Sequence, residues 1–547
     1  MIPAIMRLRS ELRPSRWLRF RVWLAATAAA VALPAACGDE AASLRGTKLV
    51  DGRALANAVF TPHRQDHQLL YEAPIGPEPR WDLRTVPFAG GADRRLAADV
   101  VRGTRSWDAE NRLYLLRRAR PTDALTPDGQ PPGVANLARI SFADGATDEI
   151  PGVSTYLVDR DGRLVYLALP EGAAEATLHL RETDGTDRAL GPASPFSLQR
   201  GRLLYVVGSD RVLWQITGPG ATPMPLATGV ESFLVTPGGT HVLLQLKDAT
   251  GAAGASLVLG ALSLTTLDTR PIPRSGICCQ LGFSPDGKQA IHSDFMPPAG
   301  EGNLHFYDLA TGTDRVVPVA AQAGGEIHQA LFRPSDGPTE ARTLILRDAS
   351  FRLSIYRPGV DVMPAPLGQS GMGLAFAAGG RMLVYIQREV IDNQLSTALM
   401  SLDMEQPFAE PRRLTPSGAN ATGYFLLDGG ARIGFWAHHR GELSDVYITE
   451  AAGGEARLVL SSVGPIAVSG RRIVGIGALS KQDGVGDLVQ LDLATEDRRI
   501  IGRSVNDFAL TAACPTCDPF GPGALVAYIV QTRVPSTLDG LWAATLE

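Results

Sequence analysis

The chain has 547 residues, of which 45% are hydrophobic and 20% are charged, and its formal net charge at pH 7 is −5. These values are typical of a folded protein and argue against an intrinsically disordered chain. No basic stripe follows the N-terminal segment, so nucleic acid is not an expected partner.

The N-terminal segment has the composition of an export signal. Several arginines precede an apolar run over residues 22–36 that is too short to span a membrane comfortably. We therefore expect a signal peptide over residues 1–36 and a short tether over residues 37–44. No later segment of the sequence is both apolar and long enough to span a bilayer.

The end of this segment, Leu33-Pro-Ala-Ala-Cys37-Gly38, resembles the lipobox of bacterial lipoproteins. The resemblance implies that Cys37 is diacylated and becomes the first residue after cleavage, so that lipid chains anchor the protein to a membrane. Because Gly38 follows Cys37, it also implies an outer-membrane location, facing the periplasm or the cell surface. The segment departs from the usual pattern, since Pro34 takes the position at which Leu33 would be expected. A plain secretory signal is the alternative.

The rest of the chain repeats one pattern: a hydrophobic strand, a tight Asp-Gly or Gly-Gly turn, and a second hydrophobic strand. The clearest copy runs from Leu281 to His292, and weaker copies cover residues 156–166, 233–243, 374–385 and 424–435. The turn glycines recur at roughly 40 to 50 residues. They are Gly162, Gly239, Gly287, Gly337, Gly380, Gly430 and Gly470. The one wider gap, between Gly162 and Gly239, holds a further copy at Gly201. A period of this size predicts a stacked or radial repeat architecture.

A second strand pair follows the first in each repeat. Residues 304–317 and 488–501 are two such pairs, and they share the turn sequence Asp-Leu-Ala-Thr. Four short strands per repeat, rich in β-branched and aromatic residues, are typical of one propeller blade. Asp-Gly and Gly-Gly supply the positive φ that a two-residue hairpin needs, and stacked blades bury each other's faces. The expected fold is therefore all-β, a β-propeller of four-stranded blades.

The number of repeats exceeds that of a common propeller. We count about eleven units, whereas rings typically hold about four to eight blades. Two tandem propellers are therefore favoured over one large ring, with repeats over residues 45–270 in the first and residues 271–547 in the second. No linker composition marks the boundary near residue 270. An N-terminal strand within residues 49–60 is expected to pair with the last blade and close a ring.

Two segments resemble the repeats of TolB-type, WD-like β-propellers. They are Phe283-Ser-Pro-Asp-Gly287-Lys, which is the closer match, and the segment from His438 to Tyr447. The same repeat occurs in the propellers of prolyl-peptidase-like enzymes. The resemblance covers most of the chain after the signal peptide and implies the fold, but propellers host many unrelated functions.

The four remaining cysteines form two tight pairs, Cys278 with Cys279 and Cys514 with Cys517. Export implies an oxidising compartment, in which such cysteines usually form disulfides. A structural bridge is therefore favoured, and metal binding or redox activity are the alternatives. Redox-active Cys-x-x-Cys pairs normally open a helix in a βαβ unit, which this chain lacks.

Histidines gather loosely in the second half of the sequence: His292, His305, His328, His438 and His439. His328 precedes an expected inner strand and is the candidate for a side chain facing a central channel. No pair has the spacing and carboxylate neighbour of a metal site, so hydrogen-bonded or solvated histidines are expected and no metal or cofactor is predicted.

Hydrolase and nucleotide-binding motifs are missing from the sequence, including Gly-x-Ser-x-Gly and Gly-x-x-x-x-Gly-Lys-Ser/Thr. The expected function is that of a membrane-anchored cell-envelope β-propeller, a non-enzymatic scaffold that binds an envelope protein or peptide through its loops. The alternative is a propeller enzyme, similar to a lactonase, cyclase or lyase, with its active site in the central channel.

Overall fold

The structure is a computed structural model of the chain. It describes residues 46–546 apart from residues 53–54, 62–67, 76–80, 102–103, 111, 119–134, 143–146, 170–174, 237, 248–256, 273–279, 285, 294–301, 320–326, 335–342, 349, 359, 392–393, 439–442, 513–519, 521–522 and 533. In this part of the chain it contains 42 strands and two short 3-10 turns, η4 (Ala378–Gly380) and η5 (Asp428–Gly430). None of the described residues forms a helix long and apolar enough to cross a membrane.

Seven antiparallel sheets of the described chain have four strands each, hydrogen-bonded in sequence order. The first three are β2 (Ala56–Phe60), β3 (Gln68–Pro74), β4 (Trp81–Pro87), β5 (Arg94–Ala97); β13 (Ala193–Gln199), β14 (Arg202–Val207), β15 (Val212–Ile216), β16 (Met224–Ala227); and β17 (Val230–Val235), β18 (His241–Lys247), β19 (Leu257–Ser263), β20 (Thr269–Pro271). The next two are β21 (Gln280–Phe283), β22 (Gln289–Ser293), β23 (Gly302–Asp308), β24 (Asp314–Val319); and β25 (Ile327–Phe332), β26 (Leu344–Asp348), β27 (Arg352–Tyr356), β28 (Ala365–Ser370). The last two are β29 (Met372–Ala377), β30 (Met382–Ile391), β31 (Gln394–Asp403), β32 (Arg412–Arg413); and β33 (Asn420–Leu427), β34 (Arg432–His438), β35 (Asp445–Glu450), β36 (Arg457–Leu460).

Two further sheets have seven strands each. One consists of β6 (Ser106–Trp107), β7 (Arg112–Arg118), β8 (Ala135–Ser141), β9 (Thr147–Val158), β10 (Leu164–Ala168), β11 (Thr177–Arg181) and β12 (Asp187–Gly191). The other consists of β37 (Ile466–Ser469), β38 (Arg472–Gly477), β39 (Gly486–Asp492), β40 (Arg498–Thr511), β41 (Leu525–Val530), β42 (Gly540–Thr545) and the N-terminal strand β1 (Thr47–Asp51).

One long strand explains each seven-stranded sheet. The first part of β9 pairs with β8 and its last residues pair with β10, with Val153 at the change of partner. In the same way β40 pairs with β39 and then with β41, with Val505 at the change. Each long strand is thus the fourth strand of one four-stranded unit and the first strand of the next. For this reason the described chain has nine separate sheets instead of the about eleven expected from the repeats.

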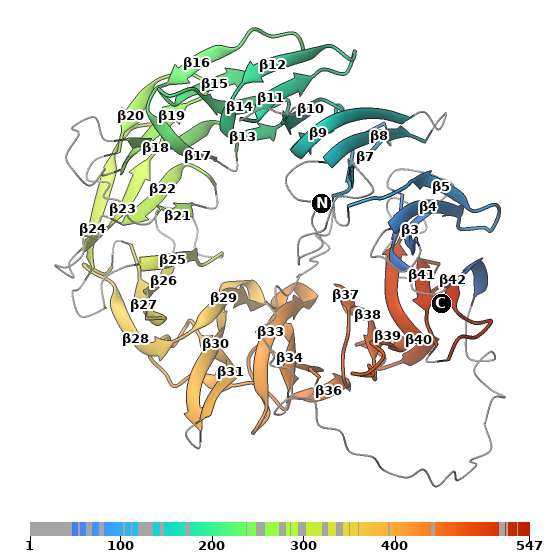
Figure 1. The fold of residues 1–547 in the computed structure, drawn as a ribbon. Helices are drawn as coiled ribbons and strands as arrows, with labels where there is room; N and C mark the ends of the chain where they lie inside the picture. The colour runs from blue at the N-terminus through green and yellow to red at the C-terminus, as the bar shows by residue number, and fades with distance from the viewer. Residues whose placement is uncertain are drawn as a thin grey trace, which may run out of the picture. The chain divides into compact units, whose positions relative to one another are not determined.

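The described chain forms two compact units, one made of residues 60–461 and the other of residues 462–547 with the described part of residues 1–59. In the larger unit the sheets follow one another along a curved path, with β13, β17 and β21 on its inner side and β16, β20 and β24 on its outer side (Figure 1). In the smaller unit β1 pairs antiparallel with β42, Thr47 opposite Ala543, so the N-terminal strand completes the last sheet. This antiparallel, blade-by-blade arrangement is a β-propeller fold, which confirms the expected fold class.

The core of the larger unit lies between successive sheets. Leu70 and Leu83 of one sheet pack with Leu113 and Leu115 of the next, and clusters of the same kind recur along the unit. Burying one such leucine contributes about 1.5–3 kcal/mol, so each sheet depends on its neighbours. The expected division near residue 270 into two rings stays a prediction.

The hairpin turns have the backbone conformation that the sequence pattern predicts. Positive φ values occur at the turn glycines Gly162, Gly201, Gly239, Gly287, Gly380, Gly430 and Gly470. Gly337 lies outside the described residues. These turns reverse the chain between the first two strands of a unit and so set where the neighbouring charged residues are placed.

Candidate functional site

Most of the residues singled out in the sequence lie outside the described residues. These are Cys37, Cys278, Cys279, Cys514, Cys517 and His439. His328 belongs to β25, but its side chain is not among those described. The lipid anchor, the disulfides and the channel histidine therefore stay predictions.

The structure brings together two of the predicted histidines. His292 in β22 lies opposite His305 in β23, and their rings stack with centroids 4.5 Å apart. Both are buried, and Nδ1 of His305 lies 2.8 Å from Oδ2 of Asp314. A substrate cannot reach rings buried in this way without a local opening of the sheet. Among the described residues no group of three or more His, Cys, Asp or Glu could hold a metal ion.

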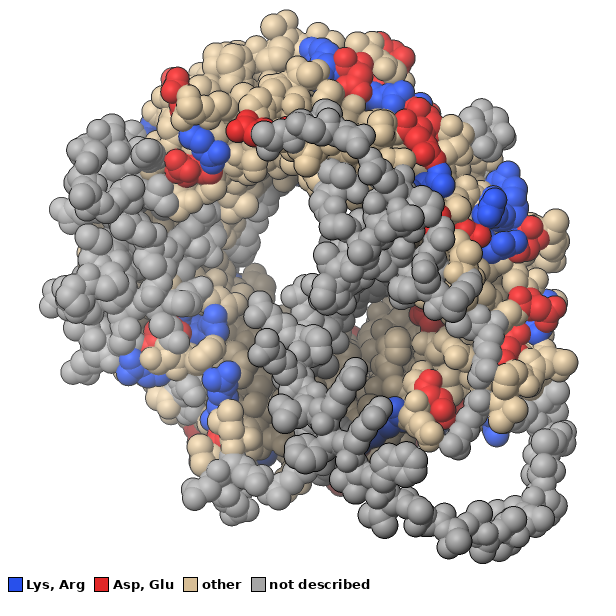
Figure 2. All heavy atoms as spheres, in the orientation of Figure 1, with Lys and Arg blue, Asp and Glu red and all other residues tan. Residues whose placement is uncertain are grey.

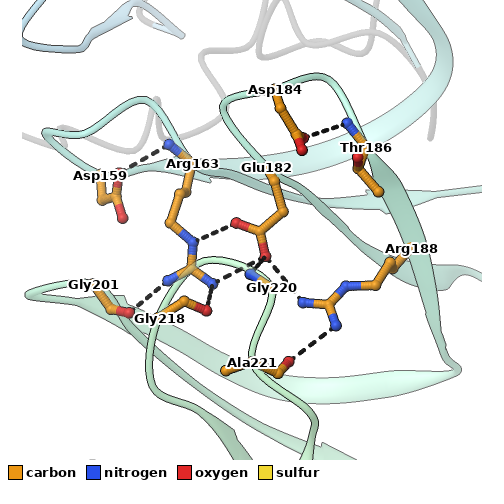
Figure 3. Close-up of polar contacts among 10 residues, drawn as sticks. All are labelled: Asp159, Arg163, Glu182, Asp184, Thr186, Arg188, Gly201, Gly218, Gly220 and Ala221. Atoms are coloured by element: carbon orange, nitrogen blue, oxygen red, sulfur yellow. Dashed lines mark hydrogen bonds and ion pairs between the residues drawn. The ribbon is translucent and has the colours of Figure 1, made fainter.

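The most deeply buried cation of the described chain is Arg163, which directly follows the turn glycine Gly162. Its side chain is 1% exposed, and its Nε donates to Oε2 of Glu182 at 2.9 Å (Figure 3). Nη2 of Arg188 donates to the other carboxylate oxygen of Glu182, also at 2.9 Å. Burying a charge is costly unless it is paired, so the two arginines and Glu182 form one interdependent network.

This network joins two successive sheets. Arg163 donates from Nη1 to the carbonyl of Gly201 and from Nη2 to the carbonyl of Gly218 at 3.3 Å, while Arg188 donates to the carbonyl of Ala221 at 3.0 Å (Figure 3). The arginines belong to the β9–β12 part of one sheet, whereas the three carbonyls belong to the turns of the β13–β16 sheet. The side chains therefore fix the turns of one blade to the next.

Burial also affects the carboxyl group of Asp159, which begins the turn that ends at Arg163. Burial raises the pKa of Asp159, although the backbone N–H of Arg163 donates to its carboxylate at 2.9 Å and opposes the rise. The turn Asp159–Arg163 is therefore held from both ends, by the Asp159 carboxylate inside the turn and by the Arg163 guanidinium outside it.

The same kind of contact recurs between other successive sheets. Arg200 donates to the carbonyl of Gly238 at 2.8 Å, Arg270 to that of Ala310 at 2.9 Å, and Arg333 to that of Gly380 at 2.8 Å. The donor and acceptor residues are separated by 38, 40 and 47 positions, close to the repeat period. We call these arginine-to-turn contacts arginine clamps.

A basic residue directly follows the turn glycine in several repeats, at Arg163, Arg202, Lys288, Arg381 and Arg471. Of these, Arg163 and Arg202 donate to a backbone carbonyl in a turn of the next sheet. Other arginines pair within their own sheet with an Asp four residues earlier, Arg112 with Asp108 at 2.6 Å and Arg352 with Asp348 at 2.9 Å.

A loop between β27 and β28 presents apolar side chains to solvent. Val360, Val362 and Met363 have exposed fractions of 71%, 86% and 45%. An ion pair bridges the base of the loop, where Arg357 donates from Nε and Nη2 to the two carboxylate oxygens of Asp361 at 3.0 and 2.8 Å. The Arg357 hydrogen bond is also the main cause of a lowered pKa of Asp361. We call Val360, Val362 and Met363, together with the Arg357–Asp361 pair, the apolar loop.

A small pocket lies beside the turn between β13 and β14. Its lining includes Arg200 and Arg202, together with Gly238 and Gly239 of the next sheet's turn. The volume of the pocket is about 200 Å³. On the face shown in Figure 2, the basic and acidic side chains of the described residues lie in small mixed groups instead of one field of a single sign.

Comparison with known proteins gives likeness of fold only. No family model matches the sequence, and no curated protein matches it. Among solved structures, the chain is similar to the tricorn protease (TM-score 0.28, 11% identity, 91% of this chain and 61% of that chain). It is also similar to dipeptidyl peptidase 4 of Porphyromonas gingivalis (TM-score 0.35, 12% identity, 76% of this chain and 65% of that chain). A third similar structure is that of a eukaryotic initiation factor (TM-score 0.38, 13% identity, 76% of this chain and 89% of that chain). The chain thus spans less than two thirds of the two peptidase chains, and likeness at this level supports no statement about activity.

Proposed function

We propose that the chain is a membrane-anchored cell-envelope β-propeller, related to TolB-type repeat lipoproteins, that acts as a non-enzymatic scaffold for binding a protein partner. The N-terminal sequence up to Cys37 supports the export and lipid anchor. The observation that supports partner binding is the apolar loop, in which Val360 and Val362 are strongly exposed.

Exposing apolar side chains to water and ordering a loop on binding both cost free energy. Single exposed apolar residues are common, but three within four positions form a local patch of the kind found at protein interfaces. The two hydrogen bonds between Arg357 and Asp361 link positions 357 and 361 in the unbound protein. Such a link reduces the ordering entropy that is lost on association.

The proposal is tested by placing a photo-reactive amino acid at position 362 of the full chain in its own envelope. The matched control is position 390, because Val390 in β30 is also a valine and is 73% exposed. We expect one saturable protein adduct from position 362 and none of the same mass from position 390. Equal adduct patterns from both positions would count against the apolar loop as the binding surface.

The enzyme alternative stays a prediction with its own test. Purified protein would be analysed for metals and assayed for turnover of lactones and related small molecules. Stoichiometric zinc or calcium together with turnover would favour the enzyme over the scaffold.

A further inference from the structure

We propose that the partner-binding surface extends from the apolar loop to Phe408, in the loop between β31 and β32, and that the partner meets it with an uncharged, apolar segment. This inference rests on the proposed scaffold function and adds to it a second contact point and a partner chemistry. Phe408 is 59% exposed. Aromatic side chains are enriched in protein interfaces, so a phenylalanine this exposed is a suitable anchor.

The two loops leave the same end of two successive sheets. In the first sheet Phe332 lies opposite Leu344, and Leu344 lies opposite Tyr356, so β25 and β27 are level at this end. Arg333 and Arg357 directly follow these strands. Their backbones are therefore separated by two strand spacings, about 10 Å. The apolar loop thus begins close to Arg333.

Arg333 connects this end of its sheet to the loop that carries Phe408. Its Nε donates to the carbonyl of Gly380 at 2.8 Å, and its Nη2 donates to Oε1 of Glu405 at 2.6 Å. The chain from Glu405 to Phe408 spans at most about 11 Å. Phe408 and the apolar loop therefore fall within one interface of standard size, which has about 20–30 residues on each side.

Backbone hydrogen bonds close the turns that place Phe408 at the surface. The N–H of Gln406 donates to the carbonyl of Asp403, and the N–H of Ala409 donates to the carbonyl of Gln406, both at 2.9 Å. At the start of the loop, Met404 is buried in the core between the two sheets. The loop is thus attached to the core at Met404, while Phe408 stays outside it.

The charges around the two loops balance. Three arginines at this end each pair with a carboxylate, and the exposed Arg412 and Glu410 have opposite signs. The pairs are Arg333–Glu405 at 2.6 Å, Arg357–Asp361 at 2.8 Å and Arg381–Asp403 at 3.2 Å. A surface without a dominant sign does not select a charged ligand, so an apolar, uncharged segment fits it best. Binding should then depend little on ionic strength.

The test places the photo-reactive amino acid at position 362 of the full chain in isolated envelopes and measures the yield of the protein adduct. The yield is compared between the unsubstituted chain, Phe408→Asp and Leu267→Asp. Leu267 is the control because it is 40% exposed and lies between β19 and β20, in the same kind of loop on another sheet. A charge buried at an interface should lower the yield at least about fivefold in Phe408→Asp and leave the control unchanged.

Two further measurements complete the test. Phe408→Leu, which keeps an apolar side chain, should retain the adduct, and the yield from the unsubstituted chain should be equal at low and high sodium chloride concentration. An undiminished adduct in Phe408→Asp would overturn the extension to Phe408 and leave the apolar loop as a binding surface. Loss of the adduct at high salt would overturn the uncharged partner segment. Absence of any adduct from position 362 would overturn this inference and the scaffold function together.

Discussion

Arg163 and Glu182 show how a single buried residue can control the contact between two blades. Their side chains are 1% and 5% exposed, and the arginine also reaches the carbonyls of Gly201 and Gly218 in the next sheet. Removing one partner of a buried ion pair leaves the other charge without compensation, which is far more costly than losing a surface pair.

We therefore predict that Arg163→Ala lowers the free energy of unfolding by about 3–5 kcal/mol. Arg160→Ala is the control, because Arg160 lies in the same turn but is exposed. Chemical denaturation followed by circular dichroism measures both. Equal loss of stability in the two variants would show that the Arg163 network does not act as described.

A second residue-scale prediction concerns Asp308 in the shared Asp-Leu-Ala-Thr turn. Burial acts to raise the pKa of Asp308, but hydrogen bonds from the backbone and hydroxyl of Thr311 and from the backbone of Ala310 lower it overall. Because its pKa is lower in the folded than in the unfolded chain, Asp308 stabilises the fold above the unfolded pKa. This contribution is lost as pH falls through the folded pKa.

The variant Asp308→Asn should consequently be less stable than wild type at pH 7, and the difference should shrink as pH falls below about 4. Asp210→Asn, at an exposed position of the same unit, is expected to show a smaller difference at pH 7. Unfolding curves measured across this pH range check the prediction, and a difference that grows on acidification would contradict it.

At the scale of the element, turns of successive blades also touch through their backbones. Gly430 of η5 has φ +93°, and a Cβ added there would lie 2.9 Å from the backbone nitrogen of Ala378 in η4. Its neighbour Gly429 also has positive φ, +65°, but nothing lies within 4 Å of an added Cβ. The two glycines share one turn and differ mainly in whether another blade's turn lies against them.

This pair gives a matched test of the turn contact. Gly429→Ala should cost only the strain of a positive φ, about 1–2 kcal/mol. Gly430→Ala should cost more, because the added methyl group also collides with the backbone of η4. Thermal denaturation of the two variants measures the difference, and a larger loss for Gly429→Ala would refute the assigned contact.

Tyrosines on first strands provide a further contact between blades. The hydroxyl of Tyr156 in β9 donates to the carbonyl of Tyr114 at 2.9 Å, and that of Tyr424 in β33 donates to the carbonyl of Val384 at 3.2 Å. Burial raises the pKa of both hydroxyl groups, which keeps them protonated as donors. Both tyrosines begin a copy of the repeated sequence pattern.

The elements were predictable from sequence because their cause is local. A turn glycine such as Gly287 and the alternating residues around it specify a hairpin by themselves. The clamps were not predictable in the same way, because the acceptor for Arg200 or Arg333 is a backbone carbonyl 38 or 47 residues away. Every residue has a carbonyl, so the sequence does not mark which one is used.

At the scale of the whole molecule, the apolar loop and the pocket were also beyond prediction from sequence. The structure shows that Val360 and Val362 face solvent beside the Arg357–Asp361 pair. The pocket combines Arg202 with the Gly239 turn of another sheet, so its composition depends on which blades are neighbours. The fold class followed from repeated local patterns, whereas the pocket arises from contacts between sheets.

The proposed membrane anchor is a property of the full chain. We predict that Cys37→Ala moves the protein from the membrane pellet to the soluble envelope fraction, because the acylated side chain is lost. Fractionation followed by immunodetection measures this, with Cys514→Ala as a control that retains Cys37. Unchanged membrane association of Cys37→Ala would indicate that another feature holds the chain at the membrane.

The proposed scaffold function depends on the binding of a protein partner at the apolar loop. The most direct measurement is the affinity of the purified full chain for the protein cross-linked from position 362, compared between Val362→Asp and Val390→Asp. Burying a charge in place of a valine at an interface core should weaken binding by at least about tenfold for Val362→Asp, with Val390→Asp close to wild type. Equal affinities of the two variants would contradict the account.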